Sequence, residues 1–126
     1  MVVTMIDKTF NYAIVGASNN KEKSGYKVTK FLNEQGYSII PVNPHESVIL
    51  DIVVSKTLTD VRSEIDVVIF VVPPTITEQV LETVNDEGIN KVWFQPGSES
   101  DLAIEFCKQN GIDYVAGACI TTPLTQ

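Results

Sequence analysis

The feature that most constrains the fold is the stretch from Tyr12 to Ser18, where an apolar run ends abruptly in three small residues. A polar stretch follows from Asn19 to Lys23, and a helical pattern begins at Ser24. This order predicts a buried strand, a tight turn and the start of a helix. In a doubly wound α/β sheet, the first strand-to-helix turn is a common site for a phosphate group.

The residues of this turn, Gly16, Ala17 and Ser18, suit an anion. The first two lack bulk, so a ligand can approach the backbone closely. The free N–H groups and the positive dipole end of the following helix favour negative charge, and the Ser18 hydroxyl adds a donor. A tight turn without a ligand is the alternative interpretation of the same residues.

The turn does not match the dinucleotide-binding fingerprint, which needs Gly-x-Gly-x-x-Gly at the start of the helix. Ser18 stands where the second glycine would be, and the next glycine, Gly25, comes too late. The second predicted strand ends at Asn43-Pro44, without the acidic residue that holds the ribose of NAD. The sequence therefore predicts a phosphorylated, nucleotide-like ligand other than NAD.

Alternating patterns along the chain predict an α/β fold. Strands are expected at about 12–15, 38–42, 67–72, 91–94 and 113–116, with helices between them and a short extended excursion at 45–57. Right-handed crossovers then give a three-layer, Rossmann-like, doubly wound parallel sheet of about five strands. The strand order is 3-2-1-4-5 if the chain reverses after the third strand. Residues 1–126 are expected to form a single domain, with 1–11 as a lead-in and 120–126 as an irregular tail.

Two of the expected helices carry start signals. Thr75 and Glu78 have the spacing of a capping box, and the polar stretch 98–101 holds the next cap. Ile76 and Leu102 fall on the apolar stripes of these helices and are expected to face inward.

Charge and composition exclude other classes of protein. The chain has 16 acidic and 9 basic residues and a net charge of −7, so a basic surface for nucleic acid or an anionic membrane is not expected. No apolar run approaches the ~20 residues needed to cross a bilayer, and no secretory signal is visible. The two cysteines have neither metal-ligand spacing nor the pattern of a disulfide framework. We expect a cytoplasmic protein without a metal site.

Ligands of such sheets bind beyond the carboxyl ends of the strands, at the switch point. The loops 16–23, 43–46 and 72–75 are expected to meet there, with 95–97 next along the same edge. Lys23 is either a phosphate contact or a surface lysine, and Gln95 is a candidate polar contact.

Several ordered motifs carry a resemblance to one family. They are Gly16-Ala17-Ser18, Lys23-Ser24-Gly25-Tyr26, Gly36-Tyr37, Pro41-Val42-Asn43-Pro44, Trp93-Phe94-Gln95-Pro96-Gly97 and Cys119. Together they resemble the small stand-alone CoA-binding proteins, which are similar in fold to the N-terminal domain of the succinyl-CoA synthetase alpha subunit. The resemblance covers about 12–119 and implies a Rossmann-like domain that binds coenzyme A.

The resemblance also implies where the parts of coenzyme A lie. The phosphates would contact 16–18, supported by 24–26 at the helix start. Asn43 and Pro44 would flank the adenosine, and 72–74 would line the slot across the sheet edge. With the residues chosen from the sheet edge, the expected cofactor-binding set is Gly16, Ala17, Ser18, Lys23, Ser24, Gly25, Tyr26, Asn43, Pro44, Val72, Pro73, Pro74, Gln95 and Cys119.

The chain departs from the family pattern after the Asn-Pro pair, before the last cysteine and in the tail after Cys119. The family often has a basic residue after the Asn-Pro pair, where this chain has His45 and Glu46. Glu46 beside a 3′-phosphate would repel it. The family commonly has Asp-Arg before the last cysteine, where this chain has Gly117 and Ala118. The phosphorylated histidine of the synthetase belongs to a second domain, so no ligase chemistry is implied.

The two cysteines have different expected roles. Cys107 lies on the inward stripe of a predicted helix, as a small buried hydrophobe does. Cys119 lies just past the last strand, where it is either a structural thiol or a thiol that forms a mixed disulfide with coenzyme A.

No group of residues in the sequence forms a catalytic constellation. The sequence therefore predicts a non-catalytic CoA-binding carrier, sensor or partner module. The alternative is a CoA-dependent or thiol-exchange enzyme that uses Cys119. An NAD-type nucleotide redox sensor is a further alternative, which the missing acidic residue disfavours.

Overall fold

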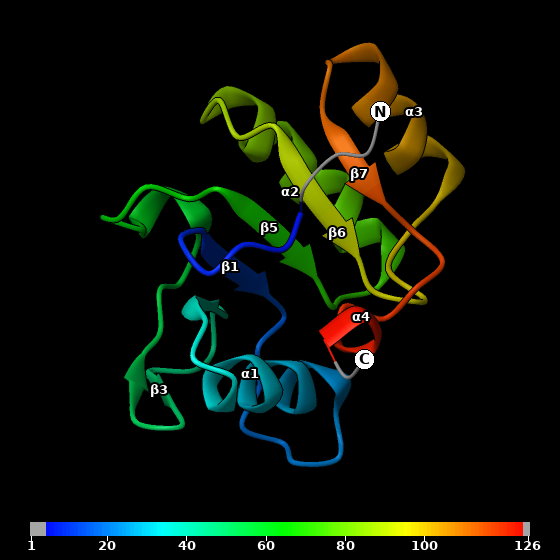
Figure 1. The fold of residues 1–126 in the computed structure, drawn as a ribbon. Helices are drawn as coiled ribbons and strands as arrows, with labels where there is room; N and C mark the ends of the chain where they lie inside the picture. Colours follow the sequence, from blue (N-terminus) through cyan, green and yellow to red (C-terminus); the bar gives the residue numbers. More distant parts are fainter. Residues whose placement is uncertain (1–4, 125–126) are drawn as a thin grey trace.

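The computed structural model describes residues 5–124 and consists of a parallel sheet with helices on both faces (Figure 1). The elements are β1 (Asn11–Val15), α1 (Ser24–Glu34), β2 (Ser38–Val42), β3 (Val48–Ile49), β4 (Ile52–Val53), the 3-10 helix η1 (Leu58–Asp60), β5 (Val67–Phe70), α2 (Pro74–Asp86), β6 (Lys91–Phe94), α3 (Asp101–Gln109), β7 (Asp113–Val115) and α4 (Thr121–Leu124). The predicted α/β, Rossmann-like fold with a five-stranded parallel sheet is confirmed.

The order of the strands differs from the prediction. The sheet runs β2-β1-β5-β6-β7, which is 2-1-3-4-5 among the parallel strands, so the predicted order 3-2-1-4-5 is wrong. That order would place β5 at an edge, although β5 is fully buried and a strand that is apolar on both faces belongs inside a sheet. The actual edge strand, β2, contains Pro41, which lacks an N–H and suits an edge. The switch point therefore lies between β1 and β5.

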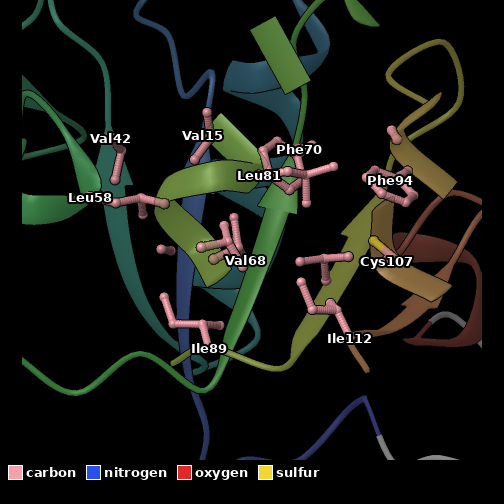
Figure 2. Close-up of a cluster of buried hydrophobic side chains, with 14 residues drawn as sticks. Val15, Val42, Leu58, Val68, Phe70, Leu81, Ile89, Phe94, Cys107 and Ile112 are labelled. Carbon is pink, nitrogen blue, oxygen red and sulfur yellow. The ribbon is translucent and has the colours of Figure 1, made fainter. Parts of the chain in front are cut away.

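The central strands divide their side chains between two cores, because successive residues of a strand point to opposite faces. Ala13 and Val15 of β1 belong to one cluster with Leu81 of α2 and Cys107 of α3. Figure 2 shows this cluster, with Val15, Leu81 and Cys107 labelled. Ile14 belongs to the second cluster, on the face covered by α1. The sheet is thus the middle layer of three.

One of the two predicted caps is present. Ser100 is the N-cap of α3, and its Oγ accepts a hydrogen bond from the Ala103 N–H at 3.0 Å. The capping box predicted at Thr75 is absent, because α2 begins two residues earlier than that cap requires, with Pro73 as an N-cap without a side-chain bond. Glu78 instead accepts a hydrogen bond of 2.6 Å from the Ser100 hydroxyl, which joins α2 to α3.

Two apolar side chains that were predicted to face inward are exposed. Ile76 of α2 is 39% exposed and Leu102 of α3 is 71% exposed. The buried stripe of α2 consists of Thr77, Leu81 and Val84. Ile76 therefore lies beside this stripe rather than on it, since the helix is rotated relative to the expected pattern.

The segment after β2 forms the predicted extended excursion. β3 and β4 pair as an antiparallel hairpin, and the chain then returns to the outer edge of β2. There the Asn43 N–H donates to the Ser55 carbonyl, and the Ser55 N–H donates to the Pro41 carbonyl, both at 3.0 Å. Ser55 thus extends the sheet by a single parallel bridge to Val42, which determines where the next residue, Lys56, lies.

The tail is more ordered than the sequence predicts. It contains α4, and Ile120 before this helix is fully buried. In the lead-in, Met5 is buried and its carbonyl accepts a hydrogen bond of 2.8 Å from the Tyr12 hydroxyl. Residues 1–4 of the lead-in lie outside the described residues.

We expect Gly25→Ala to destabilise the fold. A Cβ atom on Gly25 would lie 2.0 Å from the carbonyl oxygen of Gly16, and this backbone atom cannot move without shifting the turn after β1. Overpacking of this kind costs about 1–3 kcal/mol of the free energy of unfolding, which urea denaturation would measure. Ser24→Ala is the matched control, since Ser24 is exposed. Equal unfolding midpoints for the two variants would contradict this account of the turn.

Candidate ligand-binding site

A cavity of about 1030 Å³ lies at the carboxyl ends of β1, β2 and β5, beside the switch point. Pockets for small molecules typically measure about 300–1,000 Å³, so this cavity can hold a ligand as large as a nucleotide cofactor. Its walls come from the turn after β1, the start of α1, the loop after β2, η1 and the first turns of α2.

The cavity brings together part of the predicted site. The predicted residues that line it are Gly16, Ser18, Lys23, Ser24, Gly25, Asn43, Pro44, Val72 and Pro73. The predicted residues outside its lining are Ala17, Tyr26, Pro74, Gln95 and Cys119. Ala17 is fully buried, and Pro74 is the first residue of α2.

The fold itself requires a glycine at position 16. Gly16 has φ +103°, and a Cβ atom there would lie 2.2 Å from the Val71 carbonyl oxygen. Its small size therefore lets the turn pack against the end of β5, whether or not a ligand is present. A substitution such as Gly16→Val would test folding more than binding.

The two helices that begin at the cavity have open N-termini. Lys23 and Pro73, the N-caps of α1 and α2, make no side-chain capping bond, and neither helix has an acidic residue in its first turn. Among residues 5–124, the backbone N–H groups of Ser24 and Gly25 find no hydrogen-bond partner. By contrast, α3 begins with the Ser100 cap and an acidic first turn. Helix N-termini in this condition attract anions.

Two polar side chains order the loops around the α1 N-terminus. Asn43 donates from Nδ2 to the Ala17 carbonyl at 2.7 Å, and its Oδ1 accepts the His45 N–H at 2.7 Å. Asn43 therefore ties the end of β2 to the turn after β1. The Ser18 Oγ accepts the Asn20 N–H at 3.0 Å, which leaves the hydroxyl proton for an acceptor in the cavity.

The charged residues of the lining include Lys56, which sequence reasoning missed. Lys56 and His45 line the cavity at the end of β2, and Lys23 lines it at the start of α1. Glu22 is the acidic residue of this lining. Glu46, which was expected to repel a phosphate, does not line the cavity, and its carboxylate accepts the Asn19 N–H at 3.1 Å. The lining is thus more basic than the chain as a whole.

An apolar wall was also missed. It is formed by Leu58 of η1 together with Ile76 and Val80 of α2. This contact with the cavity accounts for the exposure of Ile76. The i, i+4 spacing of Ile76 and Val80 was visible in the sequence, but the neighbouring buried stripe made it resemble core.

Gln95 and Cys119 form a separate cluster. The Gln95 Nε2 donates to Cys119 Sγ at 3.0 Å, its Oε1 accepts the Ile120 N–H at 2.7 Å, and Thr121 Oγ1 lies 3.1 Å from the sulfur. Desolvation raises the pKa of Cys119, but the hydrogen bonds with Thr121 and Gln95 outweigh it, so its pKa lies below the ordinary value. Burial raises the pKa of Cys107 to about 11.

The described part of the chain shows no group of three residues that could hold a metal ion. Within residues 5–124, no helix is long and apolar enough to cross a membrane.

Comparison with known proteins identifies the family. A family model described as a CoA binding domain matches residues 11–124. The chain is 28% identical over 120 residues to the uncharacterized protein YneT of Bacillus subtilis, covering 92% of this chain and 86% of YneT. A conserved hypothetical protein from Pyrococcus furiosus has a similar structure, with a TM-score of 0.87 and 35% identity, covering 90% of this chain and 98% of the other. The chain belongs to the CoA binding domain family, as the motifs indicated.

Other relatives are larger enzymes. The chain is 36% identical over 92 residues to the alpha subunit of acetate–CoA ligase [ADP-forming] II from P. furiosus, which is 70% of this chain and 20% of that subunit. The chain thus spans about a fifth of this relative, and the similarity concerns that portion alone.

We expect Cys119 to be alkylated by iodoacetamide faster than Cys107. The lower pKa of Cys119 gives more thiolate at neutral pH, whereas the raised pKa of Cys107 suppresses it. Intact-mass analysis of Cys107→Ser and Cys119→Ser would follow each thiol alone. Thr121→Val, which removes one hydrogen bond to the sulfur, should move the pH–rate profile of Cys119 to higher pH. Faster labelling of Cys107 in the folded protein would contradict the assignment.

Proposed function

We propose that this protein binds coenzyme A in the cavity at the switch point and acts as a non-catalytic carrier, sensor or partner module. The pyrophosphate lies at the N-terminus of α1, against Ser18, Lys23 and Ser24. The adenosine lies beside Asn43 and Pro44, and the pantetheine arm crosses the edge of the sheet.

The observation that carries the proposal is the state of the helices at the cavity. Both α1 and α2 begin at its wall without a side-chain cap or an acidic first turn. An anionic ligand would satisfy the open N–H groups of Ser24 and Gly25 and interact favourably with both helix dipoles. Membership of the CoA binding domain family supports coenzyme A as that ligand.

The cavity is less suited to NAD. An NAD site holds the ribose with a carboxylate at the end of the second strand, whereas the lining there contains Asn43, His45 and Lys56. We therefore expect calorimetry to give micromolar binding of coenzyme A and weaker binding of NAD. Tighter binding of NAD would refute the proposal.

The pyrophosphate position has its own test. Lys23→Gln should weaken the binding of coenzyme A several-fold, because it removes a cation from the lining at the start of α1. Lys21→Gln is the matched control, since Lys21 is an exposed lysine of the same loop outside the lining. Calorimetry on both variants measures the effect. Equal affinities for the two variants would place the pyrophosphate elsewhere.

The lowered pKa of Cys119 favours a second candidate, thiol exchange. In this reaction the Cys119 thiolate attacks one sulfur of CoA disulfide, forms a mixed disulfide with one CoA moiety, and releases the other as the thiolate. The CoA disulfide is the oxidant, so the electrons balance.

Native mass spectrometry of the protein as purified from cells distinguishes the two candidates. A non-covalent adduct with the mass of coenzyme A supports binding alone. An adduct that survives denaturation and is lost with reductant supports exchange, and it should disappear in Cys119→Ser. A covalent adduct retained in Cys119→Ser would exclude that thiol.

A further inference from the structure

We propose that Lys56 recognises a phosphate on the 3′ position of the ligand's ribose and thereby selects coenzyme A over dephospho-CoA. The inference rests on the proposed function, since it places the adenosine at the end of β2.

The position of Lys56 is determined by backbone contacts. Ser55 is held to the outer edge of β2 by hydrogen bonds with Asn43 and Pro41, each 3.0 Å long. The following side chain reaches the Pro44 carbonyl, with Nζ at 3.4 Å, and lines the cavity. A cation is thus placed beside the loop that follows β2.

The charge beside the end of the second strand determines which form of ribose a doubly wound fold binds. In dinucleotide-binding folds, a carboxylate at the end of the second strand binds the ribose 2′-hydroxyl, and a basic side chain nearby accommodates a 2′-phosphate. Here the lining at that position contains Lys56 and His45. The carboxylate of Glu46 is directed to the Asn19 N–H, outside the lining.

The lining of the cavity carries basic groups on two different segments of the chain. Lys23 and the open N–H groups lie at the start of α1, whereas Lys56 lies on the loop after β4, next to the end of β2. Coenzyme A carries its pyrophosphate on the 5′ side of the ribose and a phosphomonoester on the 3′ side. Its two anionic groups therefore match the two basic regions of the lining.

The test compares ligands that differ only in this phosphate. Calorimetry with coenzyme A and dephospho-CoA should show that the wild-type protein prefers coenzyme A. Lys56→Gln should weaken the binding of coenzyme A about tenfold and leave the affinity for dephospho-CoA unchanged. Lys56→Arg should retain the preference, because it keeps the charge. Lys27→Gln is the control, since Lys27 is exposed on α1 and does not line the cavity.

Several results would overturn the inference while the proposed function stands. One is equal binding of coenzyme A and dephospho-CoA by the wild type, and another is an equal loss for both ligands in Lys56→Gln. Loss of the preference in His45→Gln but not in Lys56→Gln would assign the phosphate to His45. The affinity ratio of NADP to NAD can also be compared with that of coenzyme A to dephospho-CoA. A larger ratio for the NADP pair would assign Lys56 to a 2′-phosphate. If neither coenzyme A nor dephospho-CoA binds, the proposed function fails as well.

Discussion

The close approach of two glycines is the contact on which the rest of the structure depends. Side chains have no room at either position, since a Cβ on Gly25 would meet the Gly16 carbonyl and a Cβ on Gly16 would meet the Val71 carbonyl. These contacts bring β1, the start of α1 and the end of β5 together at one point. This point is also the switch point of the sheet. The same packing therefore forms part of the cavity wall and places the N-terminus of α1 beside the cavity.

Much of the fold followed from the sequence, because its strands and helices have distinct periods and end at turn residues. The strand order did not, although two residues signalled it. Pro41 in the second strand indicated an edge, and the fully apolar run that begins at Val67 indicated the interior. The predicted strand order was taken from dinucleotide-binding folds, and it disagrees with both of these local signals. The capping box at Thr75 failed for a similar reason, since Pro74 is already suited to the first position of a helix.

The location of the cavity was predictable, because parallel strands place all their carboxyl ends at one edge. The residues that the sequence could not supply come from segments without a periodic pattern. Lys56 lies at the cavity because the preceding residue, Ser55, forms a single β-bridge with Val42. No periodic pattern in the sequence predicts this bridge. Ile76 was visible as an apolar residue on a helix, but only the packing of α2 decides which of two adjacent stripes meets the sheet.

The contact between Ser55 and the edge of β2 also bears on how this protein behaves at high concentration. An exposed edge strand offers unpaired N–H and C=O groups to the strand of another molecule, which is a route to aggregation. At this edge Pro41 has no N–H to offer, its carbonyl is occupied by Ser55, and the Asn43 N–H is occupied as well. The segment that carries Lys56 therefore closes the carboxyl half of β2 to strand pairing with another molecule.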